Sequence, residues 1–368
     1  NNLIFFFSPA KFKFPSPFLV PGPRPPYLDK EIDRFIVEPV VYTTSFEKSG
    51  LDLERKTEQA YYYGTFHNYY QLWHNIFDFV VPFHQFVSKN NFGDSRFNRT
   101  IYVRNDGIWE FFGIDKCISV KNVRIASMIQ DSILFDKIVL GIEKPDTKTT
   151  SNDAPTMILY KYNLNSTSGI GIREEVLGDH ELPLTPQGRD GKPLVLMIDR
   201  HSPVRGMTNS NEFADYLRST CPFCEVEKVY FESMSERQQI TITSQAAVLI
   251  GIHGSGLAHV MWMHQTTNEY PTQLIEILPH RYTCRDWYKM AADVARVNYT
   301  SIEMRRKPTN ITNDEAKFCY GKDLPCTDSR CHDIYRDQKV EMEFDTFSEV
   351  WLPVVEKLQG SKFFASKD

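Results

Sequence analysis

A short loop over residues 253–256, His-Gly-Ser-Gly, has the residue types and order that suit the binding of an anion. It follows an apolar run over 246–250 that predicts a buried strand, and an apolar helix start follows it. Such a loop presents backbone N–H groups and the positive end of a helix dipole to an anionic ligand. The alternative is a turn that needs glycine only for its geometry. The residues predicted to contact the ligand are His253, Gly254, Ser255, Gly256 and Leu257.

Two arginines, Arg200 and Arg205, come directly after another predicted strand, over 194–198. Guanidinium groups match phosphate oxygens in pairs, and the carboxyl edge of a parallel sheet is where α/β folds bind ligands. We therefore predict that both arginines bind phosphate groups, with Asn209 beside them. The alternative is that the two arginines form surface ion pairs.

One carboxylate, Glu276, interrupts an apolar run over 273–277 that predicts a further strand. Burying a carboxylate among apolar residues is costly unless it is paired. In nucleotide-binding α/β folds, acidic residues accept hydrogen bonds from ribose hydroxyls. Glu276 is therefore predicted to contact ribose or uracil, and the alternative is a buried structural carboxylate.

His74 and Asp78 lie four residues apart in an aromatic-rich segment over 69–86 that predicts a helix. This spacing puts an imidazole and a carboxylate on the same helix face. Either side chain could act as a general base, or Asp78 could orient His74 for that role. The alternative is that the two side chains only pair with each other.

The elements that must position these residues follow the pattern of an α/β protein. After residue 193, predicted strands and helices alternate, which is typical of a parallel sheet flanked by helices. The predicted parts of the chain are an extended, proline-rich arm over 1–35, an N-terminal α/β domain over 36–177, a linker over 178–193, a C-terminal Rossmann-like domain over 194–320, and a cysteine-containing tail over 321–368 whose helix, over 347–358, is interrupted by Pro353.

Composition excludes several classes of protein. The chain has 368 residues, 41% of them hydrophobic, which is enough for two cores, and its net charge is −5 without a basic block. Nucleic acid is therefore not an expected partner. No apolar run reaches the roughly 20 residues that a bilayer requires, so we expect a membrane link only through an anchor or signal that precedes residue 1.

The cysteines and glycosylation sequons favour the secretory pathway, in the lumen of the endoplasmic reticulum or Golgi. Cys221 and Cys224 have no second pair with zinc-ligand spacing, so we predict a structural disulfide and no metal site. Further disulfides are expected in the tail, and the total of seven cysteines leaves one without a partner in the chain. The sequons are at Asn98, Asn165, Asn298 and Asn310.

These motifs resemble those of glycosyltransferase family 61. The run over 250–259 follows that family's glycine loop, with Ser255 in place of alanine and Ala258 in place of threonine. The arginines and Asn209 follow a second family motif, and His74 with Asp78 follows a third, in which Gln71 replaces asparagine.

The resemblance implies a GT-B-like fold, in which two Rossmann-like domains face each other across a cleft. It also implies an inverting glycosyltransferase without an essential metal or cofactor. The donor would be UDP-GlcNAc or UDP-xylose, and the acceptor a hydroxyl group of a glycoprotein or a polysaccharide. In this scheme the arginines and the glycine loop bind the donor, and His74 or Asp78 deprotonates the acceptor.

Three other functions compete with this prediction. A hydrolase with this loop would need a G-x-S-x-G elbow, which the chain does not contain. An NAD-dependent enzyme would need G-x-G-x-x-G after the first strand of the domain. The third alternative is a secreted sugar- or glycoprotein-binding module on an inactive transferase scaffold, which the Gln71 substitution leaves open.

Overall fold

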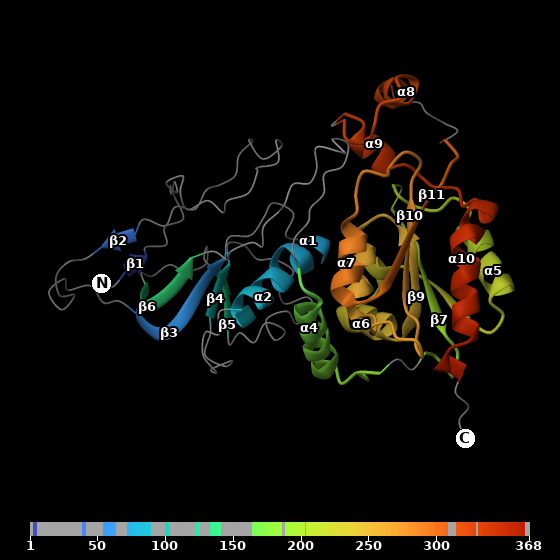
Figure 1. Ribbon diagram of the computed structural model, residues 1–368. Helices are drawn as coiled ribbons and strands as arrows, with labels where there is room; N and C mark the ends of the chain where they lie inside the picture. Colours follow the sequence, from blue (N-terminus) through green and yellow to red (C-terminus); the bar gives the residue numbers. More distant parts are fainter. Residues whose placement is uncertain are drawn as a thin grey trace. The chain divides into compact units, whose positions relative to one another are not determined.

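The computed structural model divides the chain into two units, Asn1–Thr147 and Lys148–Asp368 (Figure 1). Each unit contains its own β-sheet, so the predicted α/β class is confirmed. That the two domains face a cleft stays a prediction. The residues that the structure describes are 3–5, 39–41, 54–63, 72–89, 100–103, 122–125, 133–140, 164–185, 188–202, 204–307, 314–328 and 330–364.

Unit 1 is built on a six-stranded sheet in the order β2-β1-β6-β3-β4-β5. The four strands β6, β3, β4 and β5 are parallel to one another, and β1 runs antiparallel to both β2 and β6. Of the predicted arm over 1–35, only β1 lies within the described residues. The strands are β1 (Leu3–Phe5), β2 (Pro39–Val41), β3 (Glu54–Tyr63), β4 (Thr100–Val103), β5 (Asn122–Ile125) and β6 (Ile133–Leu140).

The predicted aromatic-rich helix of unit 1 is present as three consecutive segments. These are α1 (Leu72–Asn75), the π-helical turn η4 (Ile76–Val80) and α2 (Val81–Lys89). Apolar side chains along α1 and η4, including Trp73 and Phe77, are buried. Burial of one apolar face stabilises such short helical segments, which would be marginal in isolation.

Unit 2 contains a five-stranded, fully parallel sheet in the order β11-β10-β9-β7-β8. Three of its strands were predicted over 194–198, 246–250 and 273–277, whereas the last strand is a polar edge strand that the sequence pattern missed. The strands are β7 (Leu194–Ile198), β8 (Glu225–Val229), β9 (Ala246–Ile252), β10 (Gln273–Leu278) and β11 (Asn298–Glu303).

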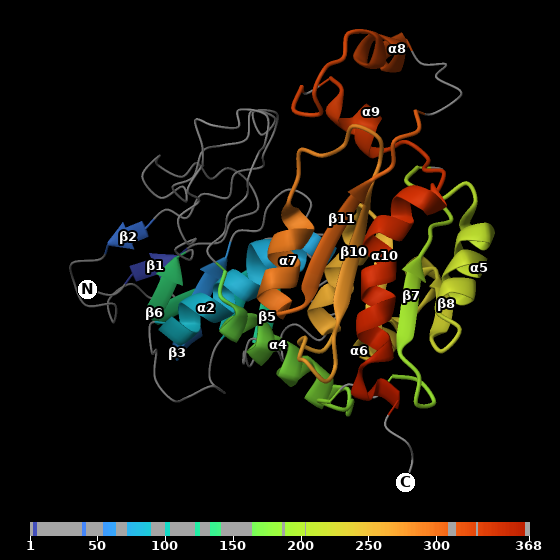
Figure 2. The same ribbon diagram turned by 45° about the vertical axis from the view of Figure 1, so that its right-hand side comes forward.

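Helices cover both faces of the unit 2 sheet (Figures 1 and 2). On one face α5 and α10 pack over the strands, and their shared core includes the fully buried Trp351, whose Nε1 donates to Thr220 Oγ1 at 2.7 Å. The other face is covered by α6, η8 and α7, and α4 packs against α7 and η8. The helices are α4 (Ser166–Asp179), α5 (Ser210–Thr220), α6 (Glu236–Ser244), η8 (Ser255–Trp262), α7 (Trp287–Ala295) and α10 (Phe344–Gln359).

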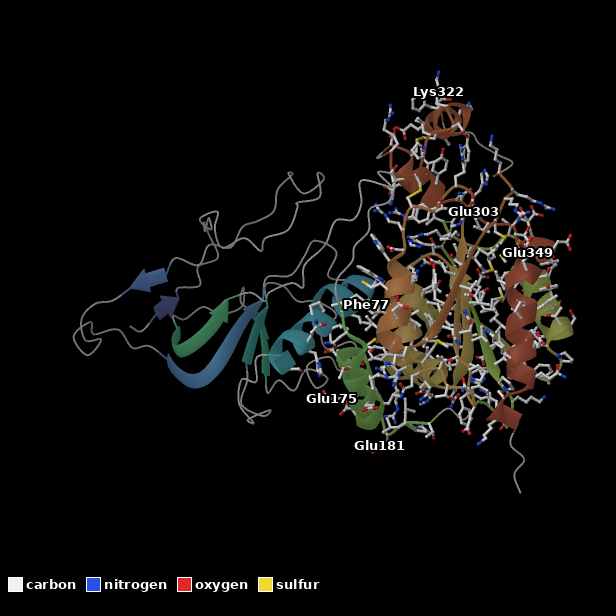
Figure 3. The ribbon with its side chains drawn as sticks, in the orientation of Figure 1. Phe77, Glu175, Glu181, Glu303, Lys322 and Glu349 are labelled. Atoms are coloured by element: carbon white, nitrogen blue, oxygen red, sulfur yellow. A yellow bond between two sulfur atoms is a disulfide. The ribbon has the colours of Figure 1, made fainter. Side chains whose placement is uncertain are left out.

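Helix α10 continues through Pro353, where the sequence predicted an interruption. A proline inside a helix cannot donate to the carbonyl four residues earlier, which here belongs to Glu349. Glu349 lies on the outer side of α10, and 57% of its side chain is exposed (Figure 3). Water can therefore reach this part of the helix, which makes the lost hydrogen bond tolerable.

Helix α4 belongs to unit 2, so the division between units falls earlier than the predicted linker at 178–193. The helix approaches α7 so closely that a Cβ at Gly169 would overlap the Val294 carbonyl. Its buried Arg173 donates from Nη1 to the carbonyls of Met263, at 3.1 Å, and Ala295, at 3.3 Å. These contacts attach the segment before the linker to α7 and to the end of η8 in unit 2.

A cysteine-rich segment over 314–337, which we call the cap, lies beyond the ends of β10 and β11 (Figures 1 and 2). It contains α8 (Asp314–Gly321) and α9 (His332–Arg336) around a small buried cluster of tyrosines and half-cystines. Within the described residues, no helix is long and apolar enough to cross a membrane.

Three disulfides confirm the predicted structural role of the cysteines. Cys221–Cys224 closes the turn between α5 and β8, Cys319–Cys331 closes the cap, and Cys284–Cys326 joins the cap to the loop after β10. The seventh cysteine, Cys117, lies outside the described residues.

Candidate functional site

The candidate site of unit 2 lies where β7 and β9 are neighbours in the sheet. Numbered along the chain within this unit, the strand order is 2-1-3-4-5, as in flavodoxin-like folds. The connection after β7 leads to α5 on one face, and the connection after β9 leads to η8 on the other (Figures 1 and 2). Such a switch point opens a crevice at the carboxyl ends of the two strands, and ligands bind there in open α/β sheets.

Arg200 and Arg205 both reach the glycine loop from the segment after β7. A Cβ built at Gly254 would overlap Nη2 of Arg200 and would lie 3.4 Å from Nη1 of Arg205. The backbone of Gly254 is extended, so glycine is required here for the close approach of the guanidinium groups. The structure thus brings together the two arginines and the loop, which the sequence analysis had assigned to one site only because both match family motifs.

Within the part of the chain that the structure describes, no ion pair joins Arg200 to a carboxylate, and only the more distant charges of Glu232 and Asp337 favour its cation. Burial lowers its pKa, and the neighbouring charge of Arg205 lowers it further. The Arg205 Nε lies 3.2 Å from Asp337 Oδ1. Two guanidinium groups thus lie side by side, only one of them in an ion pair, and an anionic ligand could neutralise their charge.

Residues 255 and 256 open helix η8, whose first N–H groups have no acceptor inside the helix. Leu257 is fully buried, and its N–H donates to the carbonyl of Gly254 at 2.9 Å. Its predicted contact with the ligand stays a prediction, as do those of Ser255 and Gly256. The loop therefore combines open backbone donors with a buried apolar anchor.

His253 and Glu276 form a buried pair behind the loop. Nδ1 of His253 lies 2.5 Å from Oε1 of Glu276, and the side chains are 3% and 0% exposed. The second oxygen of Glu276, Oε2, accepts a hydrogen bond from the Tyr299 hydroxyl at 2.5 Å. Burial and the charge of Glu276 raise the pKa of Tyr299, which keeps its phenol protonated as a donor.

Because Glu276 has no exposed surface, the geometry favours an indirect role for it, and its contact with ribose or uracil stays a prediction. Two tyrosine rings also contact the imidazole of His253 edge to face. The ring centroids of Tyr282 and Tyr288 lie 4.8 Å and 5.1 Å from that of His253.

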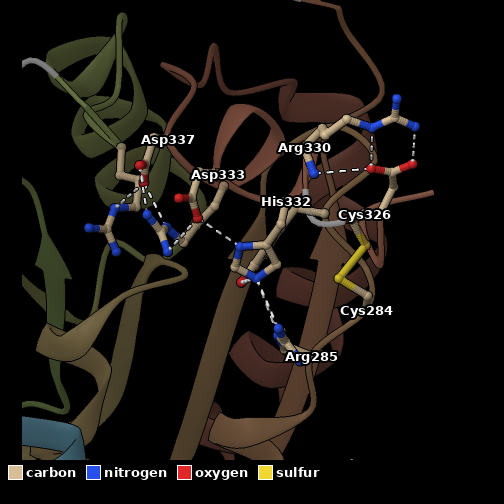
Figure 4. Close-up of polar contacts among 11 residues, drawn as sticks. Cys284, Arg285, Cys326, Arg330, His332, Asp333 and Asp337 are labelled. Atoms are coloured by element: carbon tan, nitrogen blue, oxygen red, sulfur yellow. Dashed lines mark hydrogen bonds and ion pairs between the residues drawn. A yellow bond between two sulfur atoms is a disulfide. The ribbon is translucent and has the colours of Figure 1, made fainter. Parts of the chain in front are cut away.

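Asp337 fixes Arg205 from the cap side. Its two oxygens also accept hydrogen bonds from Nε and Nη2 of Arg336, both at 2.8 Å (Figure 4). Burial alone would raise the pKa of Asp337, but the hydrogen bonds and charge of Arg336 and the charge of Arg205 lower it overall. The carboxylate therefore stays ionised and holds two guanidinium groups.

A neutral histidine continues this network toward the loop after β10. His332 Nε2 accepts hydrogen bonds from Arg285, at 3.1 Å from Nη2, and lies 3.2 Å from the Tyr282 hydroxyl (Figure 4). Nδ1 of His332 lies 2.8 Å from Asp333 Oδ1 and is therefore the protonated nitrogen. Burial lowers the pKa of His332, and the charge of Arg285 adds to this.

The sequence analysis missed Tyr299, Asp337 and His332. Tyr299 lies on a polar edge strand, and the other two lie on the cap, far along the chain from the arginines. The tail cysteines were the available signal, since Cys284–Cys326 brings the cap to the site.

Asn209 holds the segment before α10 and is not at the loop. Its Oδ1 accepts from the Met342 N–H at 2.8 Å, and its Nδ2 donates to the Met342 carbonyl at 3.1 Å. Its donor-binding role stays a prediction. His74 lies in α1 and Asp78 in η4, and the side chains of both lie outside the described residues.

Replacing Gly254 with alanine should weaken ligand binding without unfolding the protein. The new Cβ would displace only the far end of the flexible Arg200 side chain. A misplaced binding group of this kind costs roughly 10- to 100-fold, so we expect KM for the ligand to rise by that factor. Gly178→Ala is the matched control, since a Cβ there meets nothing within 4 Å. An unchanged KM in Gly254→Ala would show that the guanidinium position does not matter.

The parallel sheet flanked by helices, with two arginines at its switch point, places this unit among the α/β proteins. The family model of glycosyltransferase 61 matches residues 72–269, which is more than half of the chain. The chain therefore belongs to glycosyltransferase family 61, as its motifs indicated. The match includes His74, Asp78, both arginines and the glycine loop.

Curated relatives are named EGF domain-specific O-linked N-acetylglucosamine transferase. The chain is 25% identical to that of Drosophila melanogaster over 255 residues, 64% of this chain and 44% of the relative. It is 25% identical to that of Mus musculus over 134 residues, covering 36% and 24%. It is 32% identical to that of Gallus gallus over 87 residues, covering 23% and 16%. The chain thus spans less than half the length of these relatives.

Among solved structures, the chain is similar to a family 9 glycosyl transferase from Veillonella parvula DSM 2008. The TM-score is 0.39 at 7% identity, covering 83% of this chain and 99% of that one.

Proposed function

We propose that this protein is an inverting glycosyltransferase that moves a sugar from a UDP-sugar to a hydroxyl group of a glycoprotein or glycan. The observation that carries the proposal is the pair of guanidinium groups of Arg200 and Arg205 against Gly254, at the switch point of the parallel sheet. Membership in glycosyltransferase family 61 supports the reaction class. The names of the relatives support N-acetylglucosamine as the sugar, with xylose as the alternative.

In the proposed reaction, the donor diphosphate binds Arg200, Arg205 and the N–H groups of the glycine loop. These fixed donors stabilise the charge that develops on the diphosphate when its bond to the sugar breaks. Cationic side chains can supply this stabilisation without a metal ion or cofactor, so we propose metal-independent transfer. The acceptor hydroxyl would lose its proton to His74 or Asp78.

The proposed location is the lumen of the endoplasmic reticulum or Golgi. Three disulfides support an oxidising compartment. The sequon residue Asn298 is exposed at the start of β11, where a glycan could be attached. Disulfides and an accessible sequon are the features expected of a protein that folds in the secretory pathway.

The test is a UDP-release assay on the purified chain with UDP-GlcNAc and UDP-xylose, each with and without EDTA. Acceptors would be folded EGF-type domains, N-glycans and xylan oligomers. We expect acceptor-dependent UDP release that survives EDTA and is lost in the Arg200→Ala/Arg205→Ala variant. UDP-sugar binding without release from any pair would favour the binding module, and neither binding nor release would overturn the donor site.

A further inference from the structure

We propose that Glu276 and Tyr299 are positioning residues that let His253 take up a proton when the donor binds. His253 then provides a third cationic donor to the diphosphate, beside the two arginines. This inference rests on the proposed function and assigns roles within the same site. It concerns a buried chain of three side chains from the loop after β9, from β10 and from β11.

The hydrogen-bond pattern around Glu276 fixes the direction of this chain. Both of its oxygens face groups that donate, the Tyr299 hydroxyl at 2.5 Å and the His253 Nδ1 at 2.5 Å. Tyr299 donates to Oε2, and a carboxylate accepts at both oxygens, so we assign the proton of the second hydrogen bond to Nδ1 of His253. Nδ1–H of His253 is thereby committed to Glu276, and Nε2 is the nitrogen left to face a ligand.

A fully buried carboxylate is costly unless its charge is compensated. A protonated His253 would compensate it and form a pair of no net charge. This orientation of histidine by a carboxylate on its second nitrogen is a common device for setting the tautomer and stabilising the imidazolium.

The charged groups around His253 connect its protonation to the donor. Glu276 places a carboxylate against the imidazole, whereas Arg200 and Arg205, which contact the neighbouring Gly254, place two cations near it. The phenols of Tyr282 and Tyr288 face the imidazole as well, and burial raises the pKa of both, so neither adds a charge. A bound diphosphate neutralises the arginines and removes the repulsion.

In the transfer step, His253 would donate a hydrogen bond from Nε2–H to a diphosphate oxygen. The bond between the sugar and the diphosphate breaks, and its electron pair moves to the diphosphate. The new bond forms between the sugar and the acceptor oxygen, whose proton goes to the general base. His253 therefore stabilises the leaving group and takes no part in activating the acceptor.

The experiment is titration calorimetry of the protein with UDP-GlcNAc at about pH 7.5, in two buffers of different ionisation enthalpy. Both phosphates of a UDP-sugar are fully ionised at this pH, so any proton taken up goes to the protein. Histidine is the side chain that ordinarily titrates near neutral pH, and we expect an uptake of about half a proton per donor bound.

Three variants separate positioning from folding. His253→Gln should abolish the proton uptake. Glu276→Gln removes the charge that compensates the imidazolium, and Tyr299→Phe removes a hydrogen bond to that carboxylate. Each of these two variants should therefore reduce the uptake to roughly half or less. Tyr320→Phe is the matched control, since this buried phenol also donates to a side-chain oxygen, Gln338 Oε1 at 3.0 Å, but lies in the cap. Its uptake should equal that of the unchanged protein. Tyr299→Phe, which removes a single oxygen, serves if Glu276→Gln does not fold.

Donor binding without proton uptake would overturn this inference and leave the proposed function intact. Uptake that persists in His253→Gln would also overturn it, because the proton would then reside elsewhere. Failure of both UDP-GlcNAc and UDP-xylose to bind would instead overturn the proposed donor site.

Discussion

Replacing Arg200 with alanine is expected to lower kcat/KM for the UDP-sugar by about 100- to 1000-fold. Arg200 carries a cation that forms no ion pair with a described carboxylate, and it lies against the loop that would hold the diphosphate. Charge-assisted, paired hydrogen bonds from a guanidinium to phosphate are among the strongest polar contacts in proteins. Removal of one such preorganised donor typically costs this factor in rate.

The same substitution should leave the thermal stability unchanged or raise it. Burial and the charge of Arg205 both lower the pKa of Arg200, which means that the free protein holds this cation in an unfavourable environment. Alanine relieves that repulsion. Opposite effects on activity and stability are characteristic of a binding group and are not expected of a structural one.

Steady-state kinetics and thermal unfolding of the purified variants measure the two effects. Arg305→Ala is the matched control, because this arginine is 69% exposed and pairs only loosely with Glu349, at 3.5 Å. Arg200→Lys should recover part of the activity, since lysine restores the charge but not the paired geometry. If Arg200→Ala lowered the thermal stability as well as kcat/KM, the arginine would have a structural role.

The sequence predicted the parts of the fold that depend on local apolar patterns. Strands β7, β9 and β10 are largely apolar runs of this kind, whereas β8, with the sequence EVEKV, alternates apolar and charged residues. Strand β11 was missed because its sequence, NYTSIE, is that of a partly exposed edge strand without an apolar run.

The candidate site was predictable where strand ends carry its residues and not elsewhere. Arg200 and His253 follow two neighbouring strands, so the carboxyl edge of the sheet brings them together. Glu276 lies in a strand that is buried on both faces, and there an alternating pattern cannot tell which neighbour the side chain meets. Asp337 is brought to the site by tertiary contacts of the cap, which no local pattern encodes.

Removal of the Cys284–Cys326 disulfide is expected to have the largest effect on stability among the three described disulfides. It closes a loop with a sequence separation of 42, against 12 for Cys319–Cys331 and 3 for Cys221–Cys224. In the chain-entropy account, the corresponding losses of unfolding free energy are about 4, 3 and 1.5 kcal/mol. Paired Cys→Ser variants, unfolded in denaturant under otherwise identical conditions, give this order directly.

The same disulfide should affect the site through the cap, because it is the covalent link between the cap and the loop after β10. Without it, Asp337 and Arg336 are held less firmly, and the ion pair that positions Arg205 weakens. We expect KM for the UDP-sugar to rise about tenfold, which corresponds to about 1.4 kcal/mol of binding free energy. The Cys221→Ser/Cys224→Ser variant is the control, since its disulfide closes the turn between α5 and β8, away from the cap. If both pairs raised KM equally, the effect would reflect general loss of stability, and the cap would have no role in holding Arg205.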